Sequence, residues 1–173
     1  FYKDYDGELD AAVTAKLLAL YAEKTPSNFL PTNFNQWKDV NKNLENRLPQ
    51  SAETTLDKIE QKAVKENNQK ELLKTFLYRF KIFSLQDENP IETSINFAKD
   101  NISRLHEPEK SLFNIAIASL YETYMIFNNN LIKNNIPIAN SQQLIASSLN
   151  MKFWDEATFE RVINNYYENA LAD

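Results

Sequence analysis

His106 is the only histidine in this chain of 173 residues, and histidine is the side chain most often recruited for proton transfer and zinc binding. It lies in the sequence Leu105-His106-Glu107-Pro108, a connector between two predicted helices. A metal site would need two or three further ligands, and because the chain has no cysteine, only carboxylates are left to supply them. The pattern predicts a solvated turn rather than a catalytic or metal site.

The segment Asp4-Tyr5-Asp6-Gly7-Glu8 is similar to the start of a calcium-binding loop. Such a loop needs acids at positions 1, 3 and 5, glycine at position 6 and glutamate at position 12. Here the glycine directly follows the second acid, and position 12 counted from Asp4 is Ala15. We therefore expect Asp6 or Gly7 to cap the first helix, and we predict no metal site and no cofactor.

Neighbouring carboxylates occur at Asp87-Glu88 and Asp155-Glu156. Glycosidase chemistry would need two carboxyl groups about 5–10 Å apart across a cleft, and acids in a helical protein more naturally occupy first turns. A Gly-x-Ser-x-Gly nucleophile motif cannot be built from one glycine. The sequence thus predicts a protein that is not an enzyme; the enzyme alternative would depend on converging carboxylates or on His106.

Aromatic residues are frequent, with 11 Phe, 8 Tyr and 2 Trp. The stripe Phe76, Phe80 and Phe83 at helical spacing predicts core packing. For the tyrosines two interpretations stay open, because they could pack in the core or line a concave groove for a peptide or glycan. The candidate partner-binding residues are Tyr121, Tyr124, Tyr166 and Tyr167.

The charge balance excludes some partners. The net charge is −5 and the pI is about 5.0, so phosphate neutralisation does not favour binding to nucleic acid. No apolar run approaches the roughly 18–20 residues of a membrane-spanning helix. The chain begins at Phe1 rather than methionine, and we expect it to be a fragment, a processed form or a truncated piece of a larger protein.

These residues must be positioned by helices. A single glycine argues against hairpins and phosphate loops, and it favours an all-α fold joined by Asn, Asp and Pro turns. Segment 131–152 is ambiguous between a short helix and extended structure. The apolar spacing predicts about seven helices, over 8–24, 33–47, 49–66, 69–86, 90–105, 108–128 and from Asp155 onward.

The helix starts recur in pairs. Pro49 and Pro90 lie 41 residues apart, and Gln69 and Pro108 lie 39 apart. A two-helix unit of about 40 residues is typical of tetratricopeptide-like or HEAT-like stacking. We predict one domain over 1–173, in which an N-terminal helix and proline-containing linker (1–32) pack on a hairpin array (33–173); an irregular α-α superhelix is the alternative.

A group of short elements resembles the N-terminal helical region of alpha-2-macroglobulin-family proteins of Bacteroidetes-type bacteria. The resemblance covers about four fifths of the chain, from Trp37 to Asp173. The matching residues are Trp37 and Val40, Leu48-Pro49 with Ser51-Ala52, Ile59, Ala63, Lys65-Glu66-Asn67-Asn68, Lys74, Leu77-Tyr78-Arg79, Pro108, Lys110-Ser111, Leu120-Tyr121, Tyr124 and Trp154-Asp155.

The resemblance implies a large protein of the periplasm or cell envelope, lipid-anchored through a removed N-terminal signal, that traps or inhibits proteases. Family members carry a reactive thioester in a Cys-Gly-Glu-Gln type motif, which this chain lacks. Thioester, bait region and β-sandwiches would lie downstream, and this part would be a non-catalytic scaffold for a protein or peptide partner. The rival expectation is a free-standing helical module that binds a peptide or glycan through its tyrosines.

Overall fold

The structure is a computed structural model and describes residues 34–134 and 151–172. The predicted helix 8–24, its linker and most of the ambiguous segment 131–152 lie outside the described residues. The described part forms helices without a strand, which confirms the predicted all-α fold. The helices are α2 (Phe34–Glu45), α3 (Pro49–Lys65), α4 (Gln69–Gln86), α5 (Pro90–Asn101), η1 (Ile102–Arg104), α6 (Glu109–Phe127), α7 (Asn129–Ile132), η2 (Met151–Phe153) and α8 (Glu156–Leu171).

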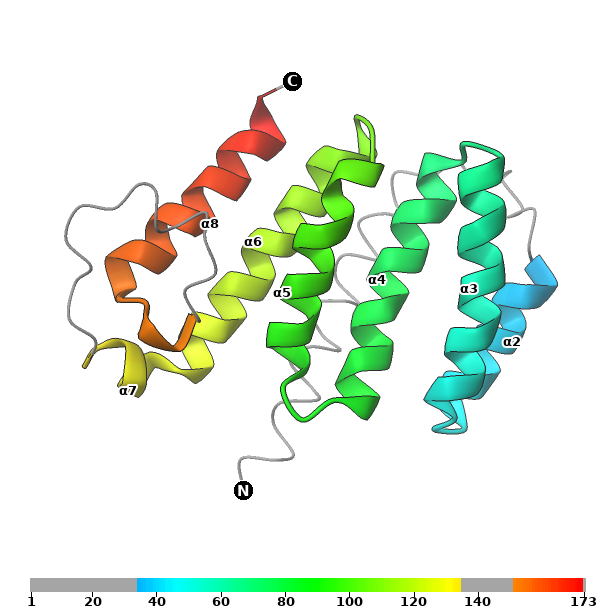
Figure 1. Ribbon diagram of the computed structural model, residues 1–173, viewed down its shortest axis with the longest axis horizontal. Coiled ribbons are helices and arrows are strands. Elements are labelled where there is room, and N and C mark those ends of the chain that lie inside the picture. The colour runs from blue at the N-terminus through cyan, green and yellow to red at the C-terminus, as the bar shows by residue number, and fades with distance from the viewer. Residues whose placement is uncertain (1–33, 135–150, 173) are drawn as a thin grey trace.

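The long helices lie side by side in a row (Figure 1). Each of α2 to α6 packs on the next helix along the chain, so α2–α3 and α4–α5 form antiparallel hairpins. Alternate helices also touch, since α4 contacts α6 and Trp37 of α2 contacts Tyr78 of α4. Helix α8 lies against α6. Contacts that join mainly neighbouring and next-neighbouring helices are typical of a stacked helical array.

The core consists of two clusters that meet in α4. Trp37, Val40 and Leu44 of α2 pack with Ala52, Leu56 and Ile59 of α3 and with Tyr78 and Ile82 of α4. The opposite side of α4 carries Phe76 and Phe80 into a larger cluster with α5, α6 and α8. Because α4 is buried on both sides, it ties the first hairpin to the rest of the array.

The phenylalanine stripe belongs to the larger cluster, as predicted. Phe76 and Phe80 are buried, and both pack against Phe97 of α5 and Phe113 of α6 with ring centroids 5.5–6.3 Å apart. Phe83 is partly buried and contacts Phe97 edge-on. Such pairs add to the stabilisation that burial itself provides.

Side-chain caps fix two of the helix starts. The Asn68 side chain accepts a hydrogen bond from the Glu71 amide at 3.1 Å, and Asp155 accepts one from the Thr158 amide at 2.9 Å. Both satisfy amides that the first turn leaves without partners. The predicted cap at Asp155 is therefore confirmed. Pro49 and Pro90 occupy first helical positions, also as predicted.

One predicted helix boundary was wrong. Helix α5 does not continue to Leu105, because the chain tightens into η1 after Asn101. The side-chain Nδ2 of Asn101 donates to the backbone carbonyl of Phe97 at 2.8 Å, and its Oδ1 accepts from the Arg104 guanidinium at 2.6 Å. These two bonds favour the tighter turn. The predicted end of the sixth helix near Asn128 is confirmed, because α6 ends at Phe127 with Asn128 as its C-cap, and the short helix α7 follows.

Candidate functional site

The four candidate tyrosines come together at the α6–α8 interface. Tyr121 stacks on Trp154 and Tyr166 with centroid distances of 5.8 and 5.7 Å, and Tyr124 stacks on Phe159 at 5.6 Å. Tyr121 and Tyr124 are only 2% and 4% exposed, so their rings are part of the hydrophobic core. The burial counts against a groove in which all four rings touch a ligand.

The hydroxyl groups of two of these tyrosines reach carboxylates. Tyr124 donates to Oε1 of Glu92 at 3.3 Å, and Tyr167 donates to Oε1 of Glu122 at 3.1 Å. Burial, followed by the charge of Glu92, raises the pKa of Tyr124 to about 12. Burial also raises the pKa of Tyr121, Tyr166 and Tyr167. All four hydroxyls thus stay protonated near neutral pH.

A cavity of about 240 Å³ opens beside Tyr124. It lies where the α4–α5 connector and the start of α5 meet the end of α6 and the turn η2. Its lining residues are Glu88, Asn89, Pro90, Ile91, Glu92, Tyr124, Phe127, Asn128 and Lys152. The cavity thus combines apolar surface with two carboxylates, two amides, a phenol and an ammonium group.

Glu92 is the central charged group of this cavity. Its Oε1 accepts the Tyr124 hydroxyl and lies 3.8 Å from Nζ of Lys152. The Glu92 side chain is 25% exposed, whereas that of Lys152 is 54% exposed. Glu88, on the connector, is exposed. Carboxylates therefore outnumber ammonium groups among the described residues of the cavity wall.

Sequence reasoning did not assemble this cavity. It expected the pair Asp87-Glu88 in a helix first turn, but α4 ends at Gln86 and α5 starts at Pro90, so the pair lies in the connector. Glu92 and Lys152 are 60 positions apart, and no spacing rule links them. The available signal was weak: an acid beside a helix-starting proline, and Tyr124 at the end of an apolar stripe.

His106 lies exposed in the connector between η1 and α6, as predicted. Its backbone amide donates to Oε1 of Gln69 at 2.9 Å, which ties the connector to the start of α4. Within 34–134 and 151–172, no group of three or more metal-ligating side chains is found.

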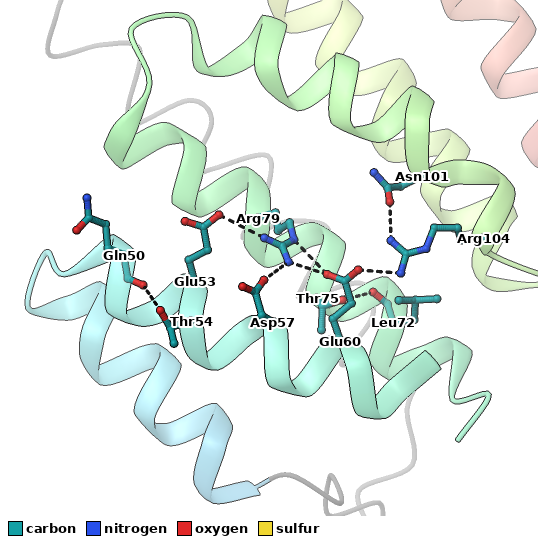
Figure 2. Close-up of polar contacts among 10 residues, drawn as sticks. All are labelled: Gln50, Glu53, Thr54, Asp57, Glu60, Leu72, Thr75, Arg79, Asn101 and Arg104. Atoms are coloured by element: carbon teal, nitrogen blue, oxygen red, sulfur yellow. Dashed lines mark hydrogen bonds and ion pairs between the residues drawn. The ribbon is translucent and has the colours of Figure 1, made fainter. Parts of the chain in front are cut away.

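A cluster of charged side chains joins α3, α4 and η1 (Figure 2). Glu53, Asp57 and Glu60 follow one another along one side of α3 and point to Arg79 of α4. Arg104 approaches Glu60 from η1 at 2.8 Å. Each carboxylate is held by a guanidinium group, so the cluster works as a clamp between helices rather than as an open binding site.

The Arg79 side chain is 13% exposed, as is that of Glu60. Burial by itself would lower the pKa of Arg79, but hydrogen bonds and charge from Glu60 and Asp57 outweigh it, and the net pKa is raised. Arg79 and Arg104 also lie 5.8 and 5.1 Å from the centroids of Phe97 and Phe76. These contacts fix α3 and α4 against α5 and η1.

The elements that carry the alpha-2-macroglobulin resemblance also serve packing. Trp37 is 3% exposed, and its ring centroid lies 4.7 Å from that of Tyr78. The Lys74 ammonium sits 4.0 Å from the centroid of the Trp37 ring, and desolvation lowers its pKa although Glu71 raises it. These residues therefore explain how α2 and α4 join.

No family model, no curated protein and no solved structure matches this chain. Among the residues that the structure describes, no helix is both long and apolar enough to cross a membrane. The resemblance to alpha-2-macroglobulin-family proteins thus stays a prediction from the sequence.

Proposed function

We propose that this chain is a non-catalytic helical scaffold that binds a protein or peptide partner. The observation that carries the proposal is the cavity beside the start of α5 and the end of α6, where apolar and charged side chains from separate elements converge. Stacked helical arrays offer rigid surfaces of this kind to peptides. The polar side chains of the Arg79 cluster are engaged between helices, which suits a structural role for that part of the array.

As part of the same proposal, the scaffold belongs to an alpha-2-macroglobulin-like envelope protein whose later domains trap or inhibit proteases. The sequence elements around Trp37 and Leu77-Tyr78-Arg79 support this parentage. Sequencing the DNA upstream and downstream of the segment that encodes this chain tests the parentage. We expect a Cys-Gly-Glu-Gln type motif and β-sandwich domains in the same open reading frame; a frame without either overturns the parentage and leaves the scaffold proposal standing.

The rival is a free-standing module that binds a peptide or glycan through its tyrosines. Its support is narrower, because the Tyr121 ring is enclosed by Trp154 and Tyr166. Tyr124 lines the cavity, while Tyr166 and Tyr167 are partly buried on α8. This version of the function would use the cavity rather than an open tyrosine face.

Selection from a displayed random-peptide library tests partner binding directly. The folded 173-residue chain is the bait, and a helical protein of similar size and charge is the matched control. We expect a family of related peptides that binds the chain and not the control. The same peptides, once purified, should bind the chain with measurable dissociation constants. Failure to enrich any related family over the control overturns the partner-binding proposal.

A further inference from the structure

We infer that the cavity between α5 and α6 binds the cationic side chain of a lysine or arginine in a partner peptide. The inference deepens the proposed function, since it names the chemical group that the scaffold recognises. It depends on the size of the cavity, on its charges and on the position of Lys152.

The size of the cavity fits one side chain. Pockets for drug-sized molecules measure roughly 300–1,000 Å³, and this cavity has about 240 Å³. Pro90, Ile91 and Phe127 supply apolar wall for the methylene groups of a long side chain. Lysine and arginine combine such an apolar stem with a charged end that stays hydrated or paired.

The charges of the cavity favour a cation. Among the described residues that line the cavity, Glu88 and Glu92 face one ammonium group, that of Lys152. The starting end of α5 and the final end of α6 meet there with opposite dipoles, so the helix ends largely cancel and the carboxylates set the sign. The Tyr124 hydroxyl donates to Glu92 and keeps an acceptor lone pair, which adds an oxygen for an N–H donor.

Lys152 shows that Glu92 accepts an ammonium group. Its Nζ lies 3.8 Å from Glu92 Oε1, and its side chain is more than half exposed on the short turn η2. An incoming cation competes with Lys152 for the Glu92 carboxylate, so Lys152 acts as an internal competitor.

A titration followed by amide NMR tests the inference on the full chain. The probes are the N-acetyl methylamides of lysine, arginine, norleucine and glutamate, together with free cadaverine. Norleucine matches lysine in its stem but lacks the charge. We expect lysine and arginine probes to shift amide signals of 88–92 and 124–128, and norleucine and glutamate probes to leave them in place.

Substitutions of the carboxylates and of Lys152 are expected to change the affinity for the lysine probe in opposite directions. Glu92→Gln is expected to weaken binding of the lysine probe at least tenfold, because a charge-assisted hydrogen bond is lost. Glu88→Gln, on the exposed connector, weakens it less and provides a second variant if Glu92→Gln does not fold. Lys152→Ala strengthens binding about threefold, since the internal competitor is gone.

The matched controls lie outside the cavity. Glu122 accepts the Tyr167 hydroxyl much as Glu92 accepts that of Tyr124, so Glu122→Gln tests the loss of a similar carboxylate. Lys99 is an exposed lysine at the end of α5, and Lys99→Ala is the counterpart of Lys152→Ala. Both variants are expected to bind the lysine probe as the parent chain does.

Three outcomes would overturn the inference: equal shifts from norleucine and lysine, binding of the glutamate probe that Lys152→Ala abolishes, or cadaverine binding far tighter than the peptide-like probes. Library peptides whose binding ignores Glu92 also overturn it and leave the partner-binding proposal intact. If the lysine probe binds at Glu92 but the library selection yields no related peptides, the cation site stands and the partner-binding proposal fails.

Discussion

The indole Nε1 of Trp37 donates a hydrogen bond of 2.6 Å to Oε1 of Glu71, between positions 34 apart in the sequence. Both side chains are buried, at 3% and 7% exposure. The bond joins α2 to α4, two helices separated by α3. A carboxylate in such a position needs its partners, because an unsatisfied buried charge is costly.

Replacing Trp37 by phenylalanine tests this relationship. Trp37→Phe keeps an aromatic ring but removes the donor, so Glu71 loses a charge-assisted hydrogen bond inside the array. We expect the free energy of unfolding to fall by about 1–3 kcal/mol. Urea titration followed by far-ultraviolet circular dichroism measures the change.

A double-mutant cycle supplies the control. In Trp37→Phe combined with Glu71→Leu, the carboxylate that accepted this bond is also gone, so the loss should be smaller than the sum of the two single losses. Additive losses would mean that the 2.6 Å contact does not couple α2 to α4.

Arg79 is expected to resist even conservative replacement. Its guanidinium bonds to Glu60, Asp57 and Glu53 at once, and a lysine ammonium cannot reproduce this planar fork. We predict that Arg79→Lys lowers the free energy of unfolding by about 1–3 kcal/mol. Chemical denaturation of the two proteins at the same ionic strength measures it.

The matched control is Lys58→Gln, which replaces an exposed lysine on the same helix α3. Surface substitutions usually change the free energy of unfolding by no more than about 0.5 kcal/mol, so this variant should stay close to the parent chain. If both variants lose the same stability, the Arg79 cluster is not a specific clamp.

Stability should decline at alkaline pH because of the buried tyrosines. The pKa of Tyr124 is raised from 10.0 to about 12 by burial and by Glu92, so the unfolded chain releases this proton first. The unfolded state then binds fewer protons than the folded state, and unfolding becomes more favourable as pH rises. The contribution of Tyr124 is complete below pH 10 and is lost between pH 10 and about 12.

The measurement compares urea unfolding of the parent chain and Tyr124→Phe at neutral and at alkaline pH. Because phenylalanine does not titrate, the variant should lose less stability on alkalinisation, although it starts lower after losing the bond to Glu92. An identical alkaline loss in both proteins would show that Tyr124 titrates normally in the folded chain.

Arg47 and Asn67 end α2 and α3 in the left-handed conformation, with φ of 55° and 51°. In both ends the next residue donates to a carbonyl five positions back, at 2.8 Å, as in a Schellman motif. Asparagine tolerates this conformation better than arginine does, and glycine better than either. We predict that Arg47→Gly stabilises the chain by about 0.5–1 kcal/mol.

Asn67→Ala should instead lower the free energy of unfolding by about 1 kcal/mol, because alanine has no side chain to favour the left-handed region. Thermal unfolding midpoints of the two variants provide the comparison. Stabilisation by both changes, or by neither, would contradict the assigned role of these two turns.

Much of the secondary structure followed from the sequence because the responsible interactions are local. Pro49 and Pro90 start helices where a missing amide hydrogen costs nothing, and Asp155 caps α8 through an amide three residues away. Helix α4 was predicted over its observed range from apolar spacing alone. The boundary after Asn101 depends on side-chain contacts of Asn101 with Phe97 and Arg104, and apolar spacing did not anticipate it.

The candidate site was less accessible to sequence reasoning. Tyr124 was recognised as a residue of interest, but its neighbours in the cavity, Glu92 and Lys152, were not. Apolar periodicity reports which side of a helix is buried, and it carries no information on which exposed charges of different helices meet. Tyr121 illustrates the same limit. Its spacing in the sequence is compatible with a core position and with a groove, and only the structure shows that Trp154 and Tyr166 enclose its ring.

The sequence by itself determined an all-helical chain, its turn residues and its apolar faces, because these follow from backbone preferences and from spacing within single helices. Only the tertiary structure decided that Trp37 meets Glu71, that Arg79 gathers three carboxylates, and that Glu92, Tyr124 and Lys152 border one cavity. These contacts join residues far apart in the chain. They depend on how the helices stack, which is fixed by the packing of the whole core rather than by any local pattern.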